Sequence, residues 1–600
     1  MDTSGASHRT HTCGQLRSDD IGQTVTIAGW VDSSRQHGGS LIFIDLRDRY
    51  GVTQLVLDAE DSSPDLLKLA DRLRGEDVVK AVGTVRKRDG GANPRLETGE
   101  IEVVVQSFEL LSRAENPPFF PTDKDSLPNE ELRLRHRYLD LRRPRMQRIL
   151  ETRNRVAQTM RRYLDDRSFV EVETPNLCKS TPEGARDFLV PARLHPGEFY
   201  ALPQSPQIFK QILMIAGLDR YFQIARCFRD EDPRADRQAE FSQLDLEMAF
   251  VSRDDITSLM SGLFRTIWKE VLGVDVGDIP LMSYAEAMER FGSDRPDTRF
   301  GLELQDISDV AAKTDFRVFT GAIESGGVVK AIRIPNGATT ITRKQIDGHT
   351  EFVKQFGAGG LPYVKLEKGA FVTGVAKFVE PIRDQLTEAL QLEDGDLVVF
   401  AADTAKTANR ALGELRLKLA KDLNMLPPHG EKWNFLWVVD FPLMEHDEES
   451  NRWDSLHHPF TAPKPDQIDM LDKDPGATLS DAYDLVLNGS EVAGGSIRIH
   501  SSDVQAKIFS LLGMSDDEAK LKFGFLLDAL KYGAPPHGGI AVGLDRVVMH
   551  LCGTDNIRDV IAFPKTQTGA DLMSEAPSEV DAAQLDELNI AVKAIPAPTA

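Results

Sequence analysis

Two alternating segments around a charged turn, between Arg226 and Met248, constrain the fold of this chain most. In the second segment, alternate residues form one apolar and one polar row, the period of a half-buried strand. The apolar row is Leu244, Leu246, Met248 and Phe250, and the polar row is Gln243, Asp245 and Glu247. In the first segment, Phe222, Ile224 and Phe228 alternate with Gln223 and Arg229. The stretch predicts a β-hairpin in which Arg229, Asp245 and Glu247 can line one polar floor. Taken alone, a charged hairpin is more often a solvated sheet with surface ion pairs.

The length of 600 residues is too great for one hydrophobic core and predicts three or four domains. The formal net charge of -23 argues against a nucleic-acid partner, because phosphate binding requires Lys and Arg. Arginines nevertheless cluster between Arg133 and Arg162, which leaves room for a local basic surface.

The four cysteines lie far apart and form no Cys-x-x-Cys pair, which predicts reduced thiols rather than disulfides or a zinc site. No apolar run approaches the roughly 20 residues of a membrane helix. The first residues also lack the apolar stretch of a signal peptide. These features predict a soluble, cytoplasmic protein without a membrane partner.

Residues 1–114 are expected to form an all-β domain. Short strands are predicted at residues 25–31, 41–46, 52–57, 78–85 and 101–105, with one helix at 64–74. Five strands with that one helix suit an OB barrel, a fold that binds oligonucleotides or sugars. A purely structural role for the barrel stays open on fold alone. The proline-rich stretch at 115–140 predicts a hinge.

The sequence of the hairpin is more specific than its period. Phe228-Arg-Asp-Glu231, a loop with Arg234 and Arg237, and then Glu240-Phe-Ser-Gln-Leu-Asp245 resemble motif 2 of the class II aminoacyl-tRNA synthetases, in particular the bacterial-type aspartyl enzymes. The Arg-rich helix and the strand expected at 169–175 resemble motif 1, which forms a two-fold dimer interface in that family. The stretch from 538 to 551 resembles motif 3.

The resemblance implies a multidomain α+β protein. An N-terminal OB-fold β-barrel at 1–114 would be followed by the hinge at 115–140. An antiparallel-sheet catalytic core would occupy 141–295 and 426–565. An inserted α/β domain at 296–425 would separate motifs 2 and 3, and 566–600 would be a C-terminal extension. We assign no chemical role to the insertion, for which a structural or tRNA-contacting role is the safer expectation.

Nucleotide binding needs a phosphate cradle other than a P-loop or a Rossmann turn, because neither Gly-rich pattern occurs. Guanidinium groups keep their charge and bind phosphate oxygens with paired donors. The resemblance puts Arg229 on the α-phosphate and Arg546 on the far phosphate of a bent ATP, and makes Glu491 the third catalytic residue. Asp484 and Glu491 are candidates to hold Mg²⁺. The other ATP-binding residues implied are Asp230, Glu231, Gln238, Gly543, Leu544 and Asp545.

The amino acid is expected to be L-aspartate. A buried substrate carboxylate needs paired cations, which Lys210 and Arg498 would supply, while Gln207 and Asp245 would face the ammonium group. The separation of Glu491 and Arg498 requires a bulge or turn if both are to face one site. The resemblance adds Glu183, on a Pro- and Gly-flanked loop, together with Ser205, Arg229 and His457. Lysyl enzymes would need acidic groups here, and asparaginyl enzymes would have less use for two cations.

The barrel is expected to read the anticodon of tRNA(Asp). A loop base can stack on Phe43 while Arg35 and Gln54 bond to base edges, although Phe43 could instead lie in the barrel core. His37 and Gly91 resemble the relaxed-specificity type that also charges tRNA(Asn), since neutral histidine can donate and accept and glycine leaves room. Both could instead be ordinary turn residues. A strictly tRNA(Asp)-specific homodimer, an asparaginyl-type enzyme and an inactive RNA-binding paralogue remain as alternatives.

Overall fold

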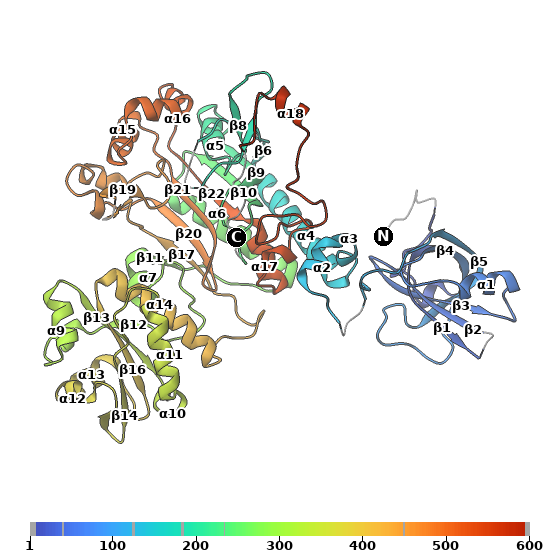
Figure 1. Cartoon of the computed structure of the whole chain (residues 1–600), viewed down its shortest axis with the longest axis horizontal. Coiled ribbons are helices and arrows are strands. Elements are labelled where there is room, and N and C mark those ends of the chain that lie inside the picture. Colours follow the sequence, from blue (N-terminus) through green and yellow to red (C-terminus); the bar gives the residue numbers. More distant parts are fainter. Residues whose placement is uncertain are drawn as a thin grey trace. The chain divides into compact units, whose positions relative to one another are not determined.

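The computed structural model describes residues 8–38, 41–122, 126–181, 185–232, 235–447 and 450–593. The chain divides into two compact units (Figure 1). The first comprises Met1–Glu151 with Arg558–Glu579, and the second comprises Thr152–Ile557 with Val580–Ala600. Across the described ranges, no helix is both long enough and apolar enough to span a membrane.

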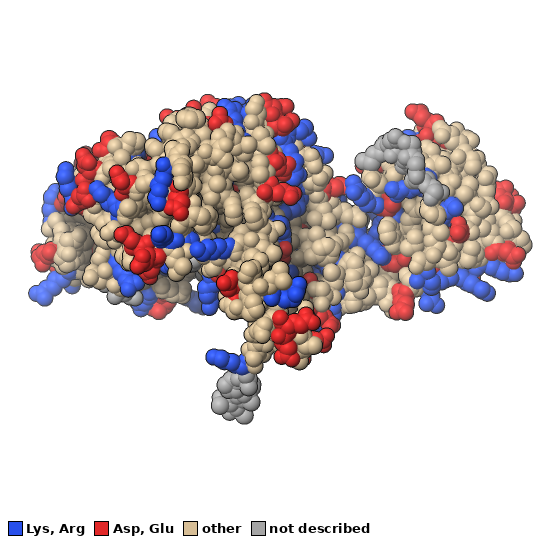
Figure 2. Space-filling view, turned by 90° about the horizontal axis from the view of Figure 1, so that it is seen from above, with Lys and Arg blue, Asp and Glu red and all other residues tan. Residues whose placement is uncertain are grey.

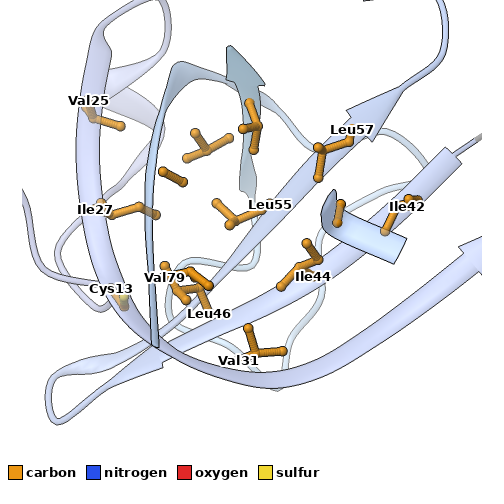
Figure 3. Packing of buried hydrophobic residues seen from close by; sticks show 14 of the residues in the cluster. Cys13, Val25, Ile27, Val31, Ile42, Ile44, Leu46, Leu55, Leu57 and Val79 are labelled. Carbon is orange, nitrogen blue, oxygen red and sulfur yellow. The ribbon is translucent and has the colours of Figure 1, made fainter. Parts of the chain in front are cut away.

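A closed five-stranded barrel forms the core of the first unit, as predicted for an OB fold. Its strands are β1 (Thr24–His37), β2 (Leu41–Asp48), β3 (Gly51–Asp58), β5 (Ile101–Ser112) and β4 (Val78–Lys87), in that spatial order, with helix α1 (Pro64–Asp71) between β3 and β4. Alternate aliphatic side chains point inward, among them Ile27, Ile44 and Leu55 (Figure 3). Because every second side chain of each strand points inward, the barrel encloses a core of apolar side chains.

The expected basic surface between Arg133 and Arg162 is only partly correct. This stretch forms α2 (Glu130–Arg135), α3 (Arg137–Asp140) and α4 (Pro144–Asp165). Arg137 is buried, where it donates to Asp140 Oδ2 at 2.5 Å and to the carbonyls of Arg558 and Ile561. Arg143 donates to Asp140 Oδ1 at 2.9 Å. These arginines stabilise the packing within the unit, because a buried guanidinium must have acceptors. On the face shown in Figure 2, basic and acidic side chains are interspersed.

An eight-stranded sheet dominates the second unit (Figure 1). Its spatial order is β11 (Leu281–Ser283), β17 (Phe435–Val439), β20 (Ala482–Leu487), β21 (Ser490–Ile497), β22 (His537–Gly543), β10 (Glu240–Ala249), β9 (Arg220–Phe228) and β6 (Val170–Glu171). All neighbours are antiparallel except β11 with β17 and β6 with β9. Helix α6 (Arg253–Leu272) packs on the sheet through Ile256, Met260 and Phe264, which are fully buried. Sheet neighbours thus come from both halves of the sequence.

The predicted hairpin is β9 with β10, paired so that Asp245 lies opposite Gln223. Leu244, Leu246 and Met248 are buried as expected. The placement of Phe250 in the same row is wrong, because β10 ends at Ala249 and Phe250 has a φ of 59° and is 72% exposed. The chain turns there, and the Phe250 amide donates to the carbonyl of Pro536 at 2.6 Å.

A second sheet forms between β11 and β17, in the order β12 (Leu304–Asp306), β13 (Val328–Ile334), β16 (Leu397–Asp403), β14 (Tyr363–Glu367) and β15 (Ala370–Val372). Alternate residues of its central strands face opposite cores: Ile332 and Val399 lie with α11 (Arg343–Lys354) and α14 (Ala405–Asp422), whereas Ala331 and Phe400 lie with α9 (Arg317–Glu324) and α13 (Arg383–Leu390). Helices therefore cover both faces of this sheet, the arrangement expected for the insertion.

Candidate active site

A cavity of about 570 Å³ opens on the eight-stranded sheet. Its walls come from β10, β21, β22 and α5 (Gln207–Ile215), from Arg229 directly after β9, and from the segment around His457. Small residues on β21 and β22, namely Gly494, Gly495 and Ala541, leave room above the sheet. The predicted residues that line the cavity are Ser205, Gln207, Lys210, Arg229, Glu231, Asp245, His457, Glu491 and Arg498.

Three buried charged residues, Lys210, Asp245 and Arg498, line one end of this cavity, and the buried Glu247 pairs with its two cations. Lys210 Nζ lies 2.9 Å from Asp245 Oδ1 and 3.6 Å from Glu247 Oε2. Arg498 donates from Nε to Glu247 Oε1 at 2.9 Å and from Nη2 to Glu247 Oε2 at 3.2 Å. Burial would raise the pKa of Glu247, but Arg498 and Lys210 lower it below its usual value. The two cations therefore favour the carboxylate form of Glu247.

Two polar atoms at this end have no hydrogen-bond partner within the described ranges. They are the amide nitrogen Nε2 of Gln207 and the carboxylate oxygen Oδ2 of Asp245. Both side chains belong to buried residues, where an unsatisfied polar atom costs about 1–3 kcal/mol. Gln207 thus offers a hydrogen-bond donor and Asp245 an acceptor beside Lys210. This combination suits a zwitterionic ligand, which carries both a carboxylate and an ammonium group.

Arg498 is held on its other edge by His458 and Ser496. Nη1 lies 2.7 Å from His458 Nε2 and donates to Ser496 Oγ at 2.7 Å. Burial and the charge of Arg498 lower the pKa of His458 well below its usual value. The neutral imidazole adds no positive charge beside the guanidinium, and the Phe460 amide donates to its Nδ1 at 3.1 Å, which holds the ring against Arg498.

A second group of carboxylates, Asp484 on β20 and Glu491 on β21, converges over Gly494. A Cβ placed on Gly494 would lie 2.8 Å from Asp484 Oδ1 and 3.5 Å from Glu491 Oε1. The expected bulge is present: Leu485 pairs with Ala493 and Val486 with Glu491, so Val492 is the extra residue. This one-residue shift of parity lets Glu491 and Arg498 line the same cavity.

The electrostatics of this carboxylate pair favour a cation. Glu491 is open to the cavity, yet the surrounding protein partly desolvates its carboxyl group, and together with Asp484 this raises its pKa to about 7. His457 Nε2 lies 3.4 Å from Asp484 Oδ1. Burial would lower the pKa of His457, but the Asp484 carboxylate raises it above its usual value. The described residues contain no cluster of three metal-ligating side chains, so a cation here would need further oxygens from a ligand.

An adjoining cavity of about 180 Å³ shares Arg229, Glu231 and Glu491 with the first. Arg229 lies over the Phe241 ring, 5.1 Å from its centre. Arg546, at the start of α17 (Leu544–Cys552), donates to the Glu491 carbonyl at 2.5 Å. The predicted residues Gln238, Gly543 and Asp545 also line this second cavity. Two guanidinium groups from distant parts of the chain thus face one continuous space.

Some predicted ATP-binding residues are placed differently. Asp230 is exposed and lines neither cavity, and Leu544 is buried in the core. Asp545 is 2% exposed and accepts hydrogen bonds from Arg153 and from the Ser242 amide, so its carboxylate ties α17 to β10. Glu183 and Arg234 lie outside the described residues.

Comparison with known protein families decides the class of this site. The family described as tRNA synthetases class II (D, K and N) matches residues 129–567, and the OB-fold nucleic acid binding domain matches residues 25–111. The chain belongs to the class II tRNA synthetases. The described residues that line the two cavities all fall within the part of the chain that matches this family.

Similar proteins cover nearly the whole chain. The aspartate–tRNA ligase of Bacillus licheniformis is 52% identical over 98% of this chain and 99% of its own. The aspartate–tRNA(Asp/Asn) ligase of Caldanaerobacter subterraneus subsp. tengcongensis is 51% identical over 98% and 99%. The solved asparaginyl-tRNA synthetase of Pyrococcus horikoshii has a TM-score of 0.58 at 20% identity, covering 93% of this chain and 98% of its own, and shares the fold.

In the barrel of this synthetase, the predicted base-reading residues sit on β1, β2 and β3. Phe43 is half-buried and outside the core cluster, so the alternative of a core position is wrong. Arg35 is paired with Asp45 at 2.9 Å. Gln54 is buried, with its amide donating to Glu102 at 2.9 Å and accepting from Arg88. Both ends of the Gln54 amide are therefore already bonded within the barrel.

The residues proposed for tRNA choice are both exposed. His37 ends β1, and its ring lies edge-on to Phe43 with centres 6.3 Å apart. Gly91 has a φ of 97°, a conformation that L residues rarely adopt, and a Cβ there would meet no atom within 4 Å. Their surroundings leave space for a ligand.

Sequence reasoning missed two contributors to the synthetase's larger cavity. His458 and Ser496 hold Arg498, and neither stood out beside His457 and Arg498. The alternation along β21 gives a signal for Ser496, which is two residues before Arg498, whereas His458 lies on another segment. Glu247 was assigned to the polar floor without its partner.

Proposed function

We propose that this synthetase is an aspartate–tRNA ligase, which forms aspartyl-adenylate from L-aspartate and ATP and then aspartyl-tRNA. The observation that carries the proposal is the convergence of Lys210 and Arg498 beside the unsatisfied Asp245 oxygen. Identity of about half over the full length to named aspartate–tRNA ligases supports it independently.

The amino-acid end would hold aspartate by charge complementarity. The side-chain carboxylate would lie against Lys210 and Arg498, and the ammonium group would donate to Asp245. Because Asp245 and Glu247 already balance the two cations, the net negative charge that aspartate brings would have to be met by a further cation, for which Arg229 at the same cavity is suited. A neutral asparagine side chain would offer only one acceptor to two cations, which disfavours it.

The first step needs no enzymatic nucleophile. The α-carboxylate oxygen of aspartate attacks the α-phosphorus of ATP, a C–O–P linkage forms, and the bond to pyrophosphate breaks. Arg229 would neutralise charge on the α-phosphate and Arg546 on the departing phosphates. In the second step, a ribose hydroxyl at the tRNA 3′ end attacks the carbonyl carbon and AMP leaves.

Mg²⁺ would be held by Asp484 and Glu491 with oxygens of the nucleotide. The fit rests on the convergence of the two carboxylates over Gly494 and on the raised pKa of Glu491, which a cation would reverse. When bound, the ion supplies charge neutralisation on the phosphates.

For the RNA partner we infer that both tRNA(Asp) and tRNA(Asn) are charged. Several relatives at about half identity are named aspartate–tRNA(Asp/Asn) ligases. His37 and Gly91 would admit either final anticodon base, with Phe43, Arg35 and Arg88 as the contacts that hold the loop. Charging of purified tRNA transcripts tests this part.

We also infer a homodimer through the edge of the catalytic sheet. Val170 on edge strand β6 is 47% exposed, and Leu177, Leu189 and Phe199 nearby in sequence are exposed apolar residues. An edge strand with exposed apolar neighbours is suited to pairing with a second copy. Sedimentation showing a fully active monomer at micromolar concentration would refute the dimer.

A further inference from the structure

The insertion at 296–425 contributes no described residue to the lining of either cavity, yet a buried arginine on its helix α14 holds the linker that connects it to α7. Arg416 on α14 is 1% exposed. Its Nη2 donates to the carbonyls of Asp297, Phe300 and Gly301 at 2.8, 3.0 and 3.0 Å. These acceptors belong to the linker that leaves α7 (Tyr284–Phe291) and enters the insertion.

Aromatic rings and close backbone contacts surround Arg416 where α14 meets the linker. The guanidinium lies over the rings of Phe300 and Phe291, at 4.0 and 4.9 Å from their centres. Burial lowers the pKa of Arg416 to about 10, so the charge is retained at neutral pH. Gly292 touches α14 so closely that a Cβ there would lie 2.1 Å from the Asn409 carbonyl oxygen. Helix α14 and the end of α7 therefore move as one body.

The linker in turn packs on the turn between β20 and β21, the two strands that carry Asp484 and Glu491. A Cβ on Gly489, whose φ is 84°, would lie 2.9 Å from Asp297 Cβ. The side-chain amide of Asn434 donates to Thr298 Oγ1 at 3.1 Å, and its backbone amide donates to Asn488 Oδ1 at 2.9 Å. The turn at Asn488 and Gly489 is thus clamped between the linker and β17.

We propose that Arg416 is a positioning residue, through which the insertion fixes the linker and the Asn488–Gly489 turn and so sets the spacing of Asp484 and Glu491 at the nucleotide phosphates. The inference rests on the proposed function, because it assigns these carboxylates to the ATP side of the site. The aspartate end depends on Lys210, Asp245 and Arg498, none of which touches the linker. Loss of Arg416 should therefore affect ATP and spare aspartate.

The test is calorimetric binding of α,β-methylene ATP, whose α–β linkage cannot be cleaved, with Mg²⁺, to the full-length chain. Arg416→Met should raise the Kd for the analogue about tenfold, since a small misplacement of charged groups carries a large cost. The Kd for aspartate without nucleotide should stay within about twofold. Arg410→Met is the matched control, because Arg410 is exposed on the same helix and should leave both constants unchanged. In pyrophosphate exchange, KM for ATP should rise while KM for aspartate does not.

Arg416→Met could fail to fold, so two milder variants accompany it. Arg416→Lys keeps the charge but loses the planar fork and should recover part of the analogue affinity. Thr298→Val removes the Asn434 contact from the linker side and should weaken analogue binding in the same direction. If folded variants bind the analogue as the wild type does, the positioning role is overturned. A wild type that shows no aspartate-dependent exchange would instead overturn the proposed function.

Discussion

Glu247 accepts a hydrogen bond from Arg498 at each carboxylate oxygen, at 2.9 Å from Nε and 3.2 Å from Nη2, although the two residues are 251 positions apart. Glu247 sits on β10 opposite Gly539 of β22, where a Cβ would lie 1.8 Å from Glu247 Oε2. A glycine is therefore required beneath the carboxylate. This pair fixes the guanidinium that faces the proposed aspartate carboxylate.

Arg498→Leu should abolish aspartate activation. The substitution leaves both Glu247 and the substrate carboxylate without a cation, a loss of about 3–5 kcal/mol for a broken buried pair. In steady-state exchange, kcat/KM for aspartate should fall by at least about a hundredfold. Arg265→Leu, an exposed arginine on α6, is the control. Circular dichroism should establish that the variant is folded, and a folded variant with wild-type kcat/KM would exclude the role given to Arg498.

Glu491→Gln should shift the Mg²⁺ requirement of exchange. The amide keeps the shape of the side chain but removes a charged oxygen ligand, so half-maximal activity should need at least about tenfold more Mg²⁺. Glu324→Gln, an exposed glutamate of α9, should leave the Mg²⁺ titration unchanged. An unaltered titration for Glu491→Gln would remove this carboxylate from the ion site.

Histidine burial should make the fold sensitive to acid. Burial and Arg546 lower the pKa of His550 from 6.5 to about 4. Between these values the unfolded chain binds the proton and the folded chain does not, so stability rises with pH and is lost as pH falls from about 6.5 to about 4. The loss from this group is about 3 kcal/mol. In chemical denaturation, His550→Gln should flatten that slope, whereas exposed His446→Gln should not. Equal slopes for wild type and His550→Gln would contradict the assignment.

The alternating period anticipated the hairpin and the five-stranded barrel, and the resemblance to the synthetase family anticipated the grouping of many cavity residues. They could not anticipate pairing across the sheet. Parity tells which face a side chain uses, but the Glu247–Arg498 contact depends on strand order and on the extra residue Val492. Phe250 fit the alternating pattern, yet the strand had ended. Arg137 looked like part of a surface, because composition carries no information about the buried Asp140 and carbonyls that surround it.

His37→Leu should change the choice of tRNA. The wild type is expected to charge tRNA(Asp) and tRNA(Asn) transcripts at comparable rates, because the glycine at position 91 leaves room and the His37 ring offers two nitrogens for hydrogen bonding to either final base. A bulky apolar side chain at position 37 should lower charging of tRNA(Asn) relative to tRNA(Asp) by about tenfold, the order of one lost base contact. If wild-type tRNA(Asn) charging is already orders of magnitude slower and the variant leaves the ratio unchanged, the relaxed specificity fails.

ATP–pyrophosphate exchange with purified wild type, run separately with aspartate, asparagine and lysine, tests the central claim most directly. The paired cations Lys210 and Arg498 beside Asp245 predict exchange with aspartate that exceeds exchange with asparagine by about 10³-fold or more, since an unsatisfied buried group discriminates strongly. Lysine should give none. Exchange that does not depend on aspartate, or that is equally fast with asparagine, would contradict the assignment of this site to aspartate activation.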